Sequence, residues 1–194
     1  ASGPIAGVLA AMHPDGYWFK PGPGYSPKYC STVWAMILLG QLGASVNCDA
    51  RLEQACGYLL EHALTEYGQF THSGAPSGTF DCLQGNLCNV LLDLGCRDPL
   101  LDAALDWMAR SNTGEGLAPR GEKDNPRRFY QYKCAPNFAC GVNENQPCAW
   151  GAVKVMLAFS KLPAERRTPQ IERAIQTGLD FLLGVDPASA AYPT

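Results

Sequence analysis

A cysteine stands at the same place in three copies of one pattern, and this internal repeat constrains the fold more than any other feature of the chain. The three cysteines are Cys30, Cys82 and Cys148. Residues five, eight and nine positions after each cysteine share one face of a helix. In the three copies they are Ala35/Leu38/Leu39, Leu87/Val90/Leu91 and Val153/Met156/Leu157. The repeat therefore predicts three helices that begin at these cysteines and bury this face.

A second, more polar helix follows each of these helices after a short turn. Its start is marked by the capping residues Asp49, Asp98 and Thr168. No window alternates polar and apolar residues with period two, so we expect no substantial sheet. The prediction is an all-α domain over 1–194 whose αα-hairpins stack into an open solenoid or a partial or complete (α/α) toroid. The hairpins span 28–64, 81–111 and 147–184, with helices at 28–43, 49–64, 81–95, 98–111, 147–161 and 168–184.

Composition narrows the class of protein. The chain has 194 residues, 46% of them hydrophobic, which is enough for one sizeable core. Its formal net charge of −3 has no block of either sign, so we expect no nucleic-acid partner. No apolar stretch approaches the roughly 20 residues of a membrane span. The chain starts without Met and ends without a clear stopping signal, so a fragment of a longer chain is one alternative.

The chain contains nine cysteines, a number that invites a disulfide framework. Cys56 and Cys88, however, fall inside amphipathic helices, where a free thiol behaves as a small buried hydrophobe. This placement indicates a reducing compartment, and we expect a cytoplasmic protein.

A long insertion, 113–146, separates the second hairpin from the third. A loop of this length in a compact domain is usually functional or disordered. Cys134, Cys140 and the aromatic run at 129–132 favour an ordered, functional loop.

Several of these segments resemble the prenyltransferase and squalene-oxidase repeat family. His13-Pro14-Asp15-Gly16-Tyr17-Trp18 resembles its Asp-Gly-Gly-Trp punctuation. The segments that begin Cys82-Leu83-Gln84-Gly85 and Cys148-Ala149-Trp150-Gly151 look most like its uncharacterised bacterial members. The likeness covers roughly Gly16 to Leu183. It implies an (α/α) toroid in which inner helices surround a central cavity.

The same resemblance implies a function. It suggests an isoprenoid-related enzyme of the terpenoid cyclase or prenyltransferase type, acting on a small apolar or isoprenoid ligand. The alternative is a toroid or solenoid that binds a small apolar ligand or a protein partner without turnover. The Asp-x-Asp-Asp acid of squalene-hopene-type cyclases and the Asp-Asp-x-x-Asp diphosphate motif are both absent from the sequence. Toroids of this type usually have more than three hairpins, so a ring completed by a second copy, as a homo-oligomer, is a further alternative.

The helix-start cysteines suggest a zinc site, because the helix N-terminus favours the thiolate that binds metal. The resemblance points the same way, since protein prenyltransferases hold zinc with an Asp-x-Cys pair and a distant His, although Asp81 and Cys82 are adjacent. The predicted ligands are Cys82, Cys140 and Cys148 with one of Cys134, His72 or Asp81. The alternative is that a helix start simply favours a small residue.

Further residues are expected around the cavity, namely Cys30, Trp34, Asp81 and Trp150. Ordinary packing within the inner layer is the alternative for the two tryptophans. Arg127, Arg128 and Lys133 could hold a diphosphate, or could lie in a solvated charged loop.

Overall fold

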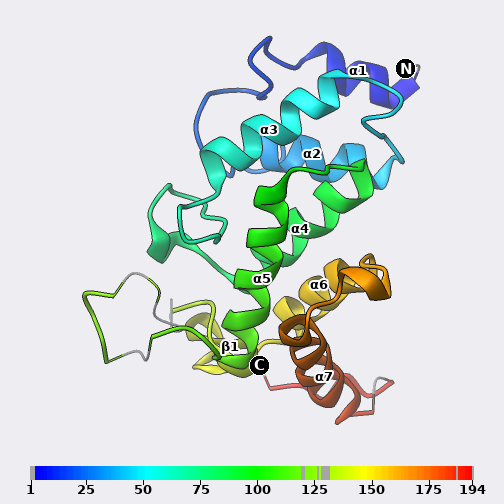
Figure 1. The fold of residues 1–194 in the computed structure, drawn as a ribbon. Coiled ribbons are helices and arrows are strands. Elements are labelled where there is room, and N and C mark those ends of the chain that lie inside the picture. Colours follow the sequence, from blue (N-terminus) through cyan, green and yellow to red (C-terminus); the bar gives the residue numbers. More distant parts are fainter. Residues whose placement is uncertain (1–2, 119–120, 126, 128–131, 187, 194) are drawn as a thin grey trace.

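The computed structural model, which describes residues 3–118, 121–125, 127, 132–186 and 188–193, has the predicted all-α class (Figure 1). A pair of two-residue antiparallel strands sets Ala139 opposite Pro147 and Cys140 opposite Gln146. Short 3-10 turns occupy Pro76–Gly78, Pro136–Phe138, Gly141–Asn143 and Ala164–Arg166. The helices and strands of the described residues are α1 Gly3–Ala10, α2 Thr32–Gln41, α3 Arg51–Ala63, α4 Asp81–Leu94, α5 Pro99–Thr113, β1 Ala139–Cys140, β2 Gln146–Pro147, α6 Ala149–Ser160 and α7 Pro169–Leu183.

Helices α3 to α7 lie within two residues of the predicted ranges, whereas α2 begins four residues later than predicted. The six helices follow one another as consecutive hairpins. The α2–α3 hairpin lies at one end of the molecule and the α6–α7 hairpin at the other (Figure 1). Asp98 caps α5 by accepting a hydrogen bond from the Leu100 amide, and Thr168 caps α7 by accepting one from the Ile171 amide. The closed ring implied by the family resemblance is not among the features of the described residues and stays a prediction.

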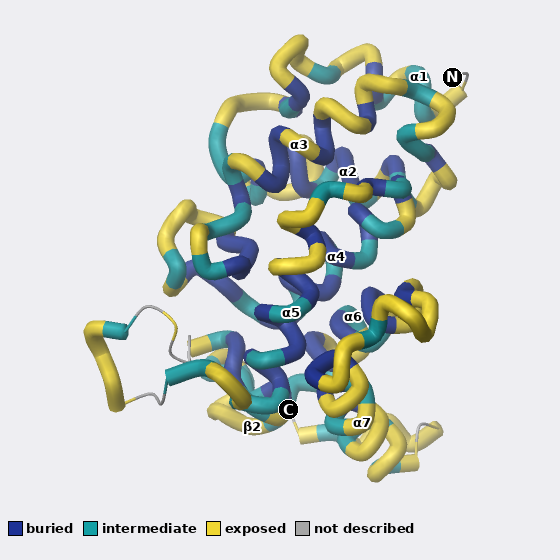
Figure 2. Tube along the Cα trace, viewed as in Figure 1, coloured by how far each residue is buried: buried dark blue, intermediate teal, exposed yellow. Residues whose placement is uncertain are grey.

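The core is centred on α4, which packs against α2, α5 and α6. Its predicted stripe of Leu87, Val90 and Leu91 is buried (Figure 2). On α2 the equivalent prediction was confirmed for Ala35 and Leu39, which are buried, but not for Leu38, which is 44% exposed. It was wrong for α6, where Val153 is 51% exposed and Leu157 is 43% exposed. Among the first helices of the three hairpins, α4 packs against both α2 and α6, whereas α2 and α6 each pack against α4 alone. As a result, α6 buries a different face, formed by Gly151, Ala152, Val155, Ala158 and Phe159.

Helices α4 and α6 approach each other unusually closely. A Cβ atom at Gly85 would lie 2.3 Å from the Lys154 carbonyl carbon, so only glycine fits there. At the other end of the contact, a Cβ at Gly151 would lie 2.9 Å from the Cβ of Asp81. These glycines bring the start of α6 against the start of α4.

The loop between α5 and α6 lies across the start of α4. The Asp81 amide donates a hydrogen bond to the Lys133 carbonyl, and Cys134 and Phe138 are completely buried. Residues 129–131 of the predicted aromatic run lie outside the described residues. So does Arg128, one of the three basic residues that the sequence suggests for a diphosphate. None of the described helices combines the length and the apolar character needed to cross a bilayer.

Candidate functional site

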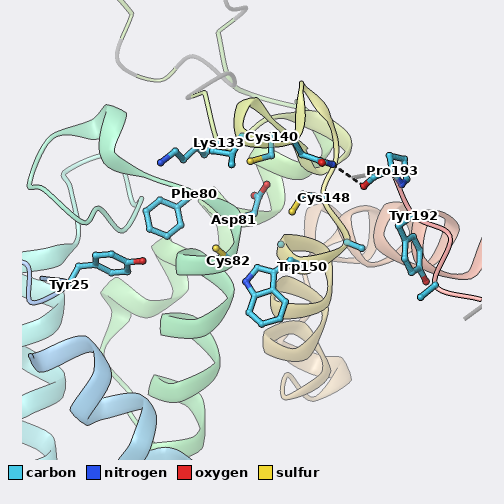
Figure 3. Close-up of a pocket in the computed structure, with 15 residues that line it drawn as sticks. Tyr25, Phe80, Asp81, Cys82, Lys133, Cys140, Cys148, Trp150, Tyr192 and Pro193 are labelled. Carbon is cyan, nitrogen blue, oxygen red and sulfur yellow. Dashed lines mark hydrogen bonds between the residues drawn. The ribbon is translucent and has the colours of Figure 1, made fainter. Parts of the chain in front are cut away.

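A cavity of about 500 Å³ opens where the starts of α4 and α6 meet the α5–α6 loop and the segment 190–193 (Figure 3). We refer to it as the site pocket. Four aromatic side chains contribute to its lining, namely Tyr25, Phe80, Trp150 and Tyr192. Three thiols also reach it, from Cys82, Cys140 and Cys148. The pocket therefore offers a mainly apolar surface to a ligand.

The fold explains why these three thiols meet. Cys82 lies in the first turn of α4, Cys140 ends β1, and Cys148 is the N-cap residue of α6. Cys148 is fixed by its backbone amide, which donates a hydrogen bond to the Phe138 carbonyl at 2.9 Å. The repeat thus brings together two of its three cysteines, with Cys140 added by the loop.

The electrostatics of Cys82 differ from the sequence prediction. The thiol is half-buried, and burial raises its pKa to about 11, with the neighbouring Asp81 carboxyl and the Cys148 and Cys140 thiols adding to the effect. The predicted thiolate at this helix start was therefore wrong for Cys82, because desolvation outweighs the helix N-terminus. Cys82 is a neutral thiol at pH 7.

The polar group that stands out in the pocket wall is Asp81, which is only 3% exposed. Its Oδ1 accepts a 3.0 Å hydrogen bond from the Cys134 thiol, whose sulfur lies 3.1 Å from Ser111 Oγ. Its Oδ2 is buried and has no hydrogen-bond partner among the described residues. Burial raises the pKa of Asp81 to about 7, although the hydrogen bond from Cys134 lowers it in part.

The zinc prediction can be compared with this geometry. Cys134 does not line the pocket. It is completely buried, and its thiol donates a hydrogen bond to Asp81. His72 is exposed and lies against the rings of Tyr25 and Phe80, at 5.8 and 5.7 Å between centroids. Within the described part of the chain, no group of three or more His, Cys, Asp or Glu side chains is arranged to hold a metal ion. The zinc site therefore stays a prediction from the sequence.

The structure separates the residues expected around the cavity. Asp81 and Trp150 line the site pocket, whereas Cys30 and Trp34 do not. Cys30 is exposed and precedes α2 by two residues. Trp34 is half-buried and its indole N–H donates to the Tyr25 carbonyl at 2.8 Å, so it supports the pocket only through Tyr25.

Of the basic residues suggested for a diphosphate, the described two, Lys133 and Arg127, lie in different places. Lys133 lines the pocket, with its Nζ 5.7 Å from the centre of the Phe80 ring. Arg127 is exposed and does not line the pocket. The amide of Arg127 is bound within the loop by the side chain of Asn125.

Three aromatic residues of the pocket were not predicted as site residues. Phe80 immediately precedes α4, so its closeness to Asp81 offered a usable signal. Tyr25 and Tyr192 belong to segments without regular structure, far from α4 in the sequence, and no spacing rule connects them to it.

Comparison of the chain with protein families, curated proteins and solved structures finds no match.

Proposed function

We propose that this protein binds a small, mainly apolar molecule that carries one oxygen function, and that an isoprenoid is the class to test first. The observation that carries the proposal is the unpartnered Oδ2 of Asp81 in the wall of an aromatic pocket. A buried polar atom without a partner is costly, and a ligand oxygen would satisfy it. The volume of about 500 Å³ lies within the range of small-molecule sites, roughly 300–1,000 Å³.

The charge around the pocket favours a neutral ligand over a diphosphate. Among the described residues that line the pocket, Lys133 is the one cation, and it already lies against the Phe80 ring. Diphosphate sites usually combine several cations or a metal ion. The carboxyl of Asp81 also faces the same space, and its ionised form would repel a phosphate.

The protonation state of Asp81 decides whether its carboxyl group can donate a hydrogen bond to the ligand or only accept one. Below pH 7 the carboxyl is protonated, and its O–H can donate to an alcohol, carbonyl or ether oxygen. Above pH 7 the carboxylate has only lone pairs to offer such an acceptor. Affinity for a ligand with an acceptor oxygen is therefore expected to fall as pH rises through about 7.

The test is to titrate the protein with farnesol, with the hydrocarbon farnesane and with farnesyl diphosphate at pH 5.5 and pH 8.5, following tryptophan fluorescence. Farnesol is expected to bind more tightly at pH 5.5, by about tenfold or more. Asp81→Asn keeps an N–H donor at this position and should bind farnesol equally at both pH values. Equal binding of farnesol and farnesane would refute the role of Asp81, and no binding of either would refute the isoprenoid class.

A second candidate is an enzyme that transfers a proton from Asp81 to the bound molecule. The raised pKa favours it, because a general acid works best when its pKa is near the working pH. An acid of this strength suits protonation of an oxygen better than protonation of an isolated alkene. Turnover of an oxygenated isoprenoid by the wild type, with binding but no product in Asp81→Asn, would support this function over simple binding.

A further inference from the structure

A second pair of cysteines, away from the site pocket, lines one cavity. Cys56 is on α3, and Cys96 is in the turn that joins α4 to α5. Both are free and buried. The interaction between the two thiols raises the pKa of Cys56 and lowers the pKa of Cys96, and a hydrogen bond from the Asp98 backbone lowers the pKa of Cys96 further.

The two thiols also share a cavity of about 500 Å³, which includes Glu53, Gly57 and Asp98 in its lining. Open space adjoins Gly57, the residue next to Cys56, since a Cβ built there would contact nothing within 4 Å. A small reagent can therefore reach the pair without displacing a side chain at Gly57.

The backbone holds Cys96 in place. The preceding residue, Gly95, ends α4 in the left-handed region with φ of 85°. The Cys96 amide donates to the Leu91 carbonyl at 2.9 Å, and the Val46 amide donates to the Leu94 carbonyl at 2.9 Å. The second bond ties the turn to the α2–α3 hairpin, which carries Cys56. Cys56 and Cys96 are thus held on the wall of the same cavity by fixed elements.

We propose that Cys56 and Cys96 form a reversible disulfide by thiol–disulfide exchange with a small disulfide, oxidised glutathione. The Cys96 thiolate attacks one glutathione sulfur, the S–S bond of glutathione breaks, and one glutathione thiolate leaves. The Cys56 thiol passes its proton to that thiolate and attacks the Cys96 sulfur, which expels the second glutathione. The protein loses two electrons, and oxidised glutathione is reduced to two thiols.

The bond would link α3 covalently to the α4–α5 turn, and so join two hairpins that otherwise meet through packing and the hydrogen bond from Val46 to Leu94. In a reducing environment the pair would remain a dithiol. The inference is independent of the proposed ligand, because the two sites share no residue.

The experiment equilibrates the full chain with mixtures of oxidised and reduced glutathione at pH 7.5, blocks free thiols with N-ethylmaleimide in denaturant, and maps the peptides by mass spectrometry. Chymotrypsin is suitable, because cleavage after Tyr58 and Leu94 separates the two cysteines. The expected product is one linked Cys56–Cys96 peptide. The midpoint of thermal unfolding should rise by about 5–10 °C, as expected for a bond that closes a long loop.

Cys88→Ser is the matched control, because Cys88 is equally buried but lies in the middle of α4. It should keep both the linked peptide and the thermal shift, whereas Cys56→Ser and Cys96→Ser should each lose them. The proposal is overturned if both cysteines stay fully alkylated under oxidising conditions. It is also overturned if the first linked peptides to form contain the exposed Cys30 or Cys48.

Discussion

The thiol of Cys134 donates a hydrogen bond to Oδ1 of Asp81, although the two residues are 53 positions apart in the chain. Both side chains are buried, so loss of this hydrogen bond would leave an unsatisfied polar group away from water and lower the stability of the fold. The hydrogen bond fixes the α5–α6 loop to the first residue of α4. The other carboxyl oxygen, Oδ2, has no hydrogen-bond partner among the described residues.

The pH dependence of stability should report on Asp81. Its pKa is about 7 in the folded protein and 3.8 in a solvated chain, so between these values the folded state holds a proton that the unfolded state has released. The stability due to this proton is complete below pH 3.8 and is lost as pH rises through 7, to a limit of about 4 kcal/mol.

Asp81→Asn does not titrate, so its free energy of unfolding relative to the wild type should rise by about 2–4 kcal/mol between pH 5 and pH 8. Urea unfolding at the two pH values measures this difference. Asp15→Asn, at an exposed position, serves as the control. A difference between variant and wild type that is constant with pH would show that Asp81 does not hold the proton.

Gly85→Ala tests the close approach of α4 and α6. The added methyl group would lie 2.3 Å from the backbone of Lys154, which cannot move without separating the helices. We expect a loss of about 3 kcal/mol or more in the free energy of unfolding.

Gly57→Ala is the matched control for this substitution, because Gly57 is also helical but has open space beside it. It should raise the free energy of unfolding by about 0.5–1 kcal/mol. Similar effects of the two alanines in urea unfolding would contradict the close helix contact.

Trp150→Ala should separate ligand binding from folding. Trp150 is 68% exposed and lines the site pocket, so its removal takes aromatic surface from the ligand and little from the core. We expect affinity for farnesol to fall by about tenfold, with a change in the free energy of unfolding within about 0.5 kcal/mol. Isothermal titration calorimetry with Leu183→Ala as control, exposed at 67% and outside the pocket, checks this.

Zinc at the pocket thiols stays a prediction from the sequence, and Cys148→Ser tests it. The described side chains favour the role of a helix-start residue, and serine is itself a good N-cap. We therefore expect the substitution to change the free energy of unfolding by less than about 0.5 kcal/mol. One zinc ion per chain in the wild type, lost in the variant together with stability, would establish the metal site instead.

The helices could be predicted from the sequence because the signals that mark them are local. Asp98-Pro99 and Thr168-Pro169 define the starts of α5 and α7, and Gly95 marks the end of α4. The buried face of α6 could not be predicted, since a face is buried only where a neighbour covers it. Val153 holds the same position of the repeat as Leu87, and the difference in their exposure comes from their places in the stack.

The candidate site could be predicted in part. The repeat marked Asp81, Cys82, Cys148 and Trp150, because a helix start is visible in sequence. The hydrogen bond between Cys134 and Asp81 depends on the path of an irregular loop, and the contribution of Tyr192 depends on the path of the last residues. No periodicity describes such paths.

The two sides of the site pocket differ in what they can accommodate. The α4–α6 side has a fixed width, because Gly85 and Gly151 leave no room for the helices to move closer and the core resists their separation. The opposite side is formed by 190–193, held by hydrogen bonds from Asn143 to the Pro193 carbonyl and from the Tyr192 hydroxyl to the Leu182 carbonyl. Changes in these few residues would alter the length of ligand that fits while the helical core stays the same. If the protein binds the proposed ligand, selectivity for its length would therefore belong to residues 190–193, and the helices would set the breadth of the molecule that is accepted.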